Sequence, residues 1–170
     1  MRCWHGDVIG TREGSNLKVS QLTLLTHLVG ASYAPGAFAA EDGAHPHHVA
    51  VVTGAARHNG KNSFAWGADY SYTFDNKVFL QGFYEQVRGE FNISAFGALV
   101  GKKFGHGWHA GIGPGVETKL KSGKNLALIR TTIGYDWHFG NWSFGPGLTF
   151  DIIEDASDTV YLGVAFGYGF

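Results

Sequence analysis

Long stretches of this chain alternate between a bulky apolar residue and a small or polar one, and this two-residue period restricts the fold more than any other feature. In residues 63–74, for example, Phe64, Trp66 and Tyr70 are separated by Ala65, glycine and Asp69. The same period runs through 107–119, 125–139, 141–153 and 158–170. Because successive side chains of a β-strand point to opposite faces, each segment predicts a strand with one bulky and one small face.

Three further segments, 48–57, 77–88 and 90–104, alternate less regularly, so we do not assign their side chains to a face. The expected strands are 48–57, 63–74, 77–88, 90–104, 107–119, 125–139, 141–153 and 158–170. The connections after the second, fourth and sixth strands are short, whereas 57–62, 121–124 and 154–157 are longer. Strands that follow one another through such connections pair as antiparallel neighbours. The fold class predicted is all-β, an up-and-down antiparallel barrel of eight strands.

Side-chain volume decides which face of this barrel points inward. The interior of an eight-stranded barrel is just wide enough for its side chains. The chain holds 26 glycines, is 15% aromatic and is only 16% charged, so its bulky faces do not fit inside while its glycine-rich faces do. We therefore predict a transmembrane barrel with its rings outside. A soluble, lipocalin-like ligand-binding barrel, which has the opposite arrangement, is the alternative.

The last strand ends in an alternating motif with a terminal phenylalanine, and aromatic residues cluster beside the short connections. Residues 48–170 resemble the small eight-stranded outer-membrane β-barrels, the class of the outer-membrane protein A membrane domain and the OmpX-like and OmpW-like proteins. The resemblance implies a location in the outer membrane of a Gram-negative envelope and an insertion signal read by the barrel-assembly machinery. The expected signal is Leu162, Val164, Phe166, Tyr168 and Phe170. The expected aromatic girdle is Phe74, Phe104, Trp108, Trp137, Phe139 and Trp142.

The first forty residues lack the alternation and are typical of an export leader. An apolar run over 22–31 is followed by small residues that end in Ala37-Phe38-Ala39, which fits the cleavage pattern of a secretory signal. We predict a signal peptide over 1–39, a polar tail over 40–47 and the barrel over 48–170. An N-terminal helix packed on the domain is the alternative for the first segment.

The small faces also carry charged and imidazole side chains, which the barrel would enclose. Charges in a narrow lumen must be paired, because desolvating them alone is costly. We therefore expect a structural polar network in which Arg130 bridges neighbouring carboxylates. Its members are Asp69, His109, Glu117, Lys119, Arg130, Asp136, His138 and Asp151. A narrow channel for small solutes or ions is the alternative.

Other functional classes have weaker support in the sequence. The basic residues Arg57, Lys61, Lys121 and Lys124 lie in or beside the longer connections and are possible contacts for lipopolysaccharide phosphates. A net charge of -1 disfavours nucleic acid as a partner. We predict no cofactor and no metal site, although His45, His47 and His48 lie close together in sequence. We also predict no enzyme activity, because His138 and Ser143 both belong to faces that point into the lumen. The sequence does not reveal the oligomeric state.

Overall fold

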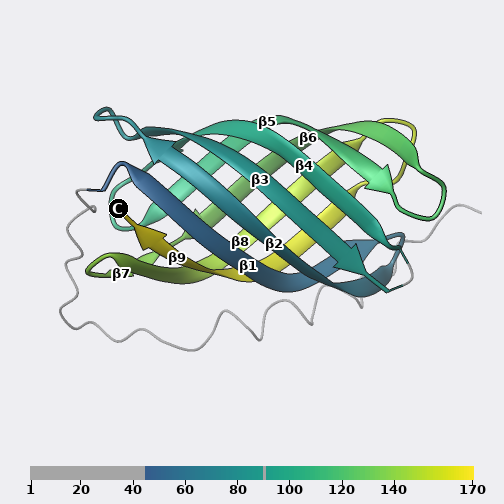
Figure 1. Ribbon diagram of the computed structural model, residues 1–170, viewed down its shortest axis with the longest axis horizontal. Helices are drawn as coiled ribbons and strands as arrows, with labels where there is room; N and C mark the ends of the chain where they lie inside the picture. Colours follow the sequence, from purple (N-terminus) through teal and green to yellow (C-terminus); the bar gives the residue numbers. More distant parts are fainter. Residues whose placement is uncertain (1–44, 90) are drawn as a thin grey trace, which may run out of the picture. The chain divides into compact units, whose positions relative to one another are not determined.

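The computed structural model describes residues 45–89 and 91–170; the predicted leader and most of the polar tail lie outside them (Figure 1). The strands are β1 (His47–His58), β2 (Lys61–Thr73), β3 (Val78–Arg88), β4 (Ile93–Lys103), β5 (Trp108–Lys119), β6 (Lys124–Tyr135), β7 (Trp137–Phe139), β8 (Trp142–Ile153) and β9 (Thr159–Gly169). Among the described residues, no helix has the length and apolar character needed to cross a membrane.

These strands close into a barrel in which every pairing is antiparallel. Each strand pairs with the next along the chain, and β1 also pairs with β9, which joins the first and last strands. β6 and β7 both pair with β8 and together form one edge of it, so the barrel has eight strand positions. The predicted eight-stranded, up-and-down barrel is therefore confirmed.

The predicted sixth strand, 125–139, is divided into β6 and β7 at Asp136. Gly134 pairs with Gly147 and Trp137 pairs with Phe144, so both segments share one register, which places Tyr135 opposite Pro146. Proline has no N–H to give to a ladder. A carbonyl of β6 opposite Pro146 therefore lacks a donor on this side. The N–H of Asp136 points the other way and donates to the carbonyl of Gly107, over 3.0 Å. The interruption thus lies beside the position that faces the proline.

The expectation of a longer connection over 57–62 is wrong. Arg57 pairs with Asn62, and only Asn59 and Gly60 connect the two strands, both with positive φ (50° and 75°). Such φ values suit the tight hairpin turns in which Asn-Gly is favoured. We call this end of the barrel, with connections 59–60, 89–92, 120–123 and 154–158, the loop end. The opposite end, with connections 74–77, 104–107 and 140–141 and with the C-terminus, is the turn end (Figure 1).

The bulky faces point outward, as predicted from volume. Exposed side chains include Val51 at 60%, Phe64 at 57% and Phe96 at 53%. The inward positions of β1 and β2 carry small residues such as Ala50, which is 8% exposed, and Ala65, which is 5% exposed. The interior has no space for the rings that the outer surface carries.

Inward glycines allow close backbone contact at some positions, and one of these gives a testable prediction. A Cβ on Gly113 would overlap the backbone of Ala98 and Leu99, whereas a Cβ on Gly147 would meet nothing within 4 Å. We expect Gly113→Ala to lower the free energy of unfolding by about 1–3 kcal/mol, since the backbone must shift. Gly147→Ala, the matched control, should change it little. Urea unfolding in lipid vesicles measures both, and equal losses would contradict the packing argument.

Candidate functional site

A buried ion-pair cluster lies in the middle of the lumen. Arg130 Nε donates to Asp151 Oδ1 over 2.8 Å and Nη2 donates to Oδ2 over 2.7 Å, so the pair is bidentate. The same Nη2 lies 2.9 Å from Glu85 Oε2. Arg130 is 5% exposed and Asp151 0%, and the guanidinium lies over the rings of Phe83 (4.0 Å to the centroid) and Tyr161 (5.2 Å). The cluster satisfies a charge that would otherwise be costly to bury.

Strand pairing explains the contact between Arg130 and Asp151, and the closure of the barrel explains the contact between Arg130 and Glu85. Arg130 and Asp151 are direct cross-strand partners on β6 and β8, so their side chains share the inward face. Glu85, on β3, reaches the guanidinium across the lumen. Glu85 is not among the predicted lumen residues, because both faces of β3 carry large residues in the sequence. The exposed Leu80 and Tyr84, against buried Phe79 and Phe83, show which face is inward.

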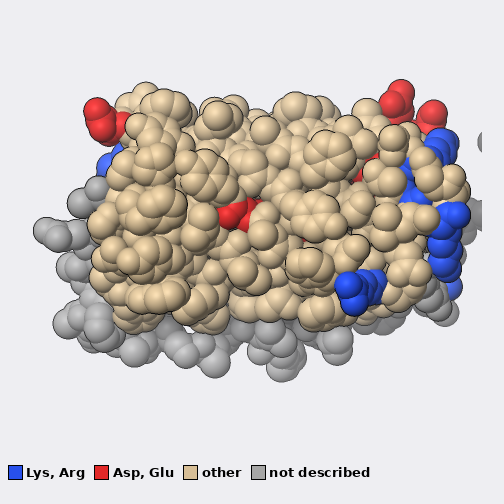
Figure 2. Space-filling view, viewed as in Figure 1, with Lys and Arg blue, Asp and Glu red and all other residues tan. Residues whose placement is uncertain are grey.

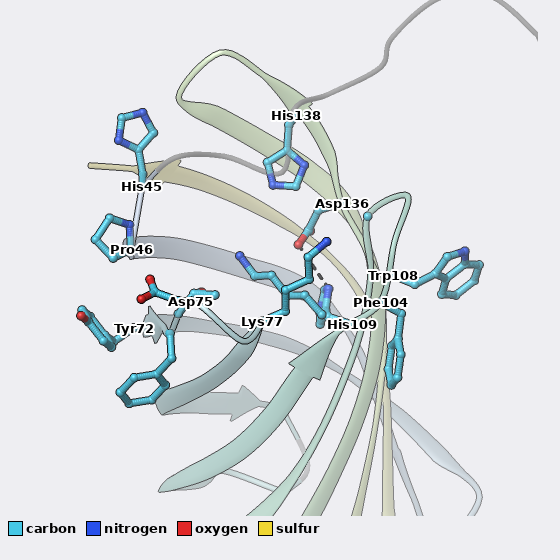
Figure 3. Close-up of a pocket in the computed structure, with 14 residues that line it drawn as sticks. His45, Pro46, Tyr72, Asp75, Lys77, Phe104, Trp108, His109, Asp136 and His138 are labelled. Carbon is cyan, nitrogen blue, oxygen red and sulfur yellow. Dashed lines mark ion pairs between the residues drawn. The ribbon is translucent and has the colours of Figure 1, made fainter.

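A second polar group lies at the turn end (Figure 3). His109 Nδ1 is 3.2 Å from Asp136 Oδ2, and in Figure 3 these two side chains point into the same cavity as His138. Deeper in the barrel, His48 Nε2 lies 2.8 Å from Ser143 Oγ. His48 is not among the predicted lumen residues, because the first strand alternates too irregularly for its faces to be assigned from the sequence.

The remaining predicted lumen residues lie apart from these two groups. Asp69 lines a small cavity together with Arg130. Glu117 is 1% exposed, and neither of its carboxylate oxygens has a hydrogen-bond partner in the described part of the chain. Lys119 is half-buried near the loop end of β5. The structure thus separates the eight predicted residues into a central cluster, a turn-end group and single side chains, in place of one continuous network.

Two apolar clusters pack inside the lumen. One reaches from the turn end toward the loop end and contains Phe79, Phe83, Ala95, Leu99, Leu126, Leu128 and Ile153. The other lies on the loop-end side and contains Ala56, Ala65, Val87, Ile93 and Tyr161, with Phe91 packed against it. No residue of the second cluster lines the cavities that lead to the Arg130 cluster.

On the face of the barrel shown in Figure 2, few charged side chains lie between the two ends. The six predicted girdle residues are all exposed, by 44–53%, and all lie near the turn end. Their rings form contacts along the surface: Trp108 with Tyr135 and Tyr135 with Trp137, each at 5.2 Å between centroids. On β9, the outward side chains are Leu162, Val164, Phe166 and Tyr168, which form the predicted insertion signal with Phe170.

The predicted basic contacts all lie at the loop end, at two connections on opposite sides of the barrel. Arg57 and Lys61 flank the β1–β2 turn, and Lys121 and Lys124 lie at the β5–β6 connection. Figure 2 shows lysine and arginine gathered at this end, beside acidic residues. The three neighbouring histidines do not converge: His47 bonds Tyr70 on the outer face, whereas His48 points inward. In the described residues, no group of three or more metal-ligating side chains could hold a metal ion.

The comparisons with known proteins concern the fold. Neither the protein-family models nor the curated proteins contain a match to this sequence. The crystal structure of Neisserial surface protein A matches with a TM-score of 0.54 at 9% identity, covering 73% of this chain and 96% of that one. The N-terminal β-barrel domain of Pseudomonas aeruginosa OprF matches with 0.52 at 16% identity, covering 71% and 97%. The chain therefore has the fold of the small eight-stranded outer-membrane β-barrels.

Proposed function

We propose that the protein is an integral outer-membrane protein of a Gram-negative envelope, with a structural or interaction role and a lumen that passes no solute. One observation carries this proposal: the apolar residues cover the outside of the barrel, while the Arg130 cluster and apolar side chains fill the inside. In a membrane barrel, lipid covers such an outer surface. A soluble barrel would expose this surface to water, at a large free-energy cost.

The role that we propose is non-enzymatic. The His48–Ser143 pair is the arrangement nearest to an activated nucleophile, but Ser143 is 2% exposed and faces the lumen. A nucleophile must reach the bond that it attacks. Lipid acyl chains lie on the opposite side of the barrel wall, so this pair is placed to hold the strands together.

Conductance in a planar bilayer tests the proposed closed barrel against the alternative of a narrow channel. The purified barrel should give no current steps in salt solution, because the Arg130 cluster and the apolar side chains on its loop-end side obstruct the lumen. A general porin, recorded under the same conditions, shows that steps are detectable. Reproducible steps from the purified barrel would establish the channel.

Extraction of cell envelopes with alkaline carbonate tests the location, since an integral protein stays with the membrane.

We propose lipopolysaccharide phosphates as the partner of the loop-end basic residues. A surface lysine near an anionic headgroup contributes about 1 kcal/mol. Adding lipopolysaccharide to phospholipid vesicles should raise the urea midpoint of the barrel, and the variant Lys121→Gln/Lys124→Gln should lose much of that increase. Lys102→Gln, which removes an exposed lysine near the turn end, is the matched control. An equal effect of both variants would count against a loop-end contact.

Deletion of Phe170 should impair assembly in cells much more than deletion of one residue from 1–20. The Phe170 N–H donates to the His47 carbonyl over 3.0 Å, and its ring stacks on His47, 5.5 Å away. The His47 N–H also donates to the Phe170 carbonyl, over 3.3 Å. Loss of two hydrogen bonds and one stacked pair costs only about 2–4 kcal/mol. The shortened protein should thus refold in lipid vesicles but fail to accumulate in the outer membrane. Equal outer-membrane yields would argue against an insertion signal.

A further inference from the structure

Three cavities follow one another into the lumen from the turn end. The first, about 460 Å³, is the mouth shown in Figure 3. The second, about 70 Å³, shares Lys103, His109, Asp136 and His138 with the mouth, so the two adjoin. The third, about 50 Å³, shares Asp69 with the second and is also lined by Arg130. The cavities therefore lead from the mouth to the central ion-pair cluster.

Polar groups line the two inner cavities along their length. Ser71, Gln81 and His48 belong to the second, and Thr132 and Glu85 belong to the third. A cavity holds a water molecule when it offers more than about 10–15 Å³ to the probe and two or more polar partners. Both inner cavities exceed that volume and offer more partners than that. Water is therefore the species that they are built to take.

The loop-end side of Arg130 is packed mainly with apolar side chains. Ala56 is 0% exposed, Val87 2% and Ile93 4%. These residues belong to one apolar cluster, and none of the cavities described above extends into it. The carboxylate of Glu117 and the hydroxyl of Tyr161 also lie on this side, buried and with no hydrogen-bond partner among the described residues. The cavities that reach Arg130 therefore open at the turn end.

We propose that the lumen is a one-sided aqueous half-channel, which admits water from the turn end as far as Asp69 and Glu85 beside Arg130. Its consequence is that these two carboxylates exchange protons with the solution at the turn end alone. The inference goes beyond the proposed function and rests on its closed lumen, since a half-channel carries no current.

Cysteine accessibility to silver ions, which are small enough to follow water, tests this directly. The background is Cys3→Ser, which removes the single native thiol. Thr132→Cys places a thiol at the innermost cavity. Thr159→Cys is the control: it also faces the lumen and loses one hydroxyl contact where Thr132→Cys loses two, but it is 0% exposed at the loop end. The fraction of thiol blocked is measured with a colour reagent after denaturation.

A second pair of variants fixes the direction of access. Ala165 lines the middle cavity, so Ala165→Phe should obstruct the route, whereas Val164→Phe adds the same ring on the outer face. We expect silver to block the thiol at position 132 in the folded barrel and Ala165→Phe to slow that reaction at least tenfold. The thiol at position 159 should stay protected, and Val164→Phe should have little effect. Heat-dependent gel migration confirms that each variant is folded.

The outcomes separate this inference from the proposed function. Protection at position 132, or a reaction there that Ala165→Phe does not slow, would overturn the half-channel. The closed lumen would still hold if the bilayer recordings show no current steps. Reaction at both positions together with current steps would instead overturn the closed lumen itself.

Discussion

Replacing Arg130 by methionine should lower the free energy of unfolding by about 3–5 kcal/mol, because it leaves buried carboxylates without their partner. Asp151 is 0% exposed and takes two hydrogen bonds from the guanidinium, and Glu85 depends on the same side chain. Methionine keeps much of the side-chain volume, so the loss of stability comes from the missing charge more than from poorer packing. Urea unfolding and refolding in lipid vesicles measures it.

A variant that lacks all three charges shows whether unpaired carboxylates cause the loss of stability in Arg130→Met. Adding Asp151→Asn and Glu85→Gln to Arg130→Met removes all three charges, and it should recover most of the stability. Arg130→Lys should be intermediate, since an ammonium keeps the charge but lacks the planar fork that meets both oxygens of Asp151. If the triple variant is no more stable than Arg130→Met alone, unpaired charge does not explain the loss.

The second large effect concerns the outer surface. Ile133 lies near the end of β6, opposite Leu148 in the middle part of β8, and is 47% exposed, whereas the neighbouring Thr132 faces inward and contacts Thr149. Ile133→Arg places a charge in the hydrocarbon, at a cost of about 2–4 kcal/mol. Thr132→Ala loses a hydroxyl and should cost about 1 kcal/mol or less. Unfolding in vesicles compares the two.

Spin labels then decide whether lipid is the cause of that difference. Ile133→Leu should be nearly silent, because it keeps the apolar character. Labels at Ile133→Cys and Thr132→Cys, in a background without Cys3, report what each face contacts. The first should relax with a lipid-soluble quencher and the second should not. Lipid contact at position 132 alone would mean that the faces are reversed, and contact at neither would remove the barrel from the membrane.

The sequence by itself determined the number of strands, their approximate bounds and which face is outside. These properties are local or depend on volume: the two-residue period assigns a side chain to one of two faces, and a narrow lumen has room for only a few of the rings. The two-residue turn at Asn59-Gly60 was also predictable from the sequence, since Asn-Gly is a strong hairpin signal. The longer connection predicted over 57–62 did not take the Asn-Gly pair into account.

Only the tertiary structure decided which polar residues meet. Arg130 and Asp151 are 21 residues apart and become partners through the register of β6 and β8. Glu85 joins them from the other side of the barrel, and His48 meets Ser143 although 95 residues separate them. Such contacts depend on how far each strand is staggered when the sheet closes. Alternation fixes the face of a residue but not its height along the lumen, so a side chain's partners appear only once the barrel is closed.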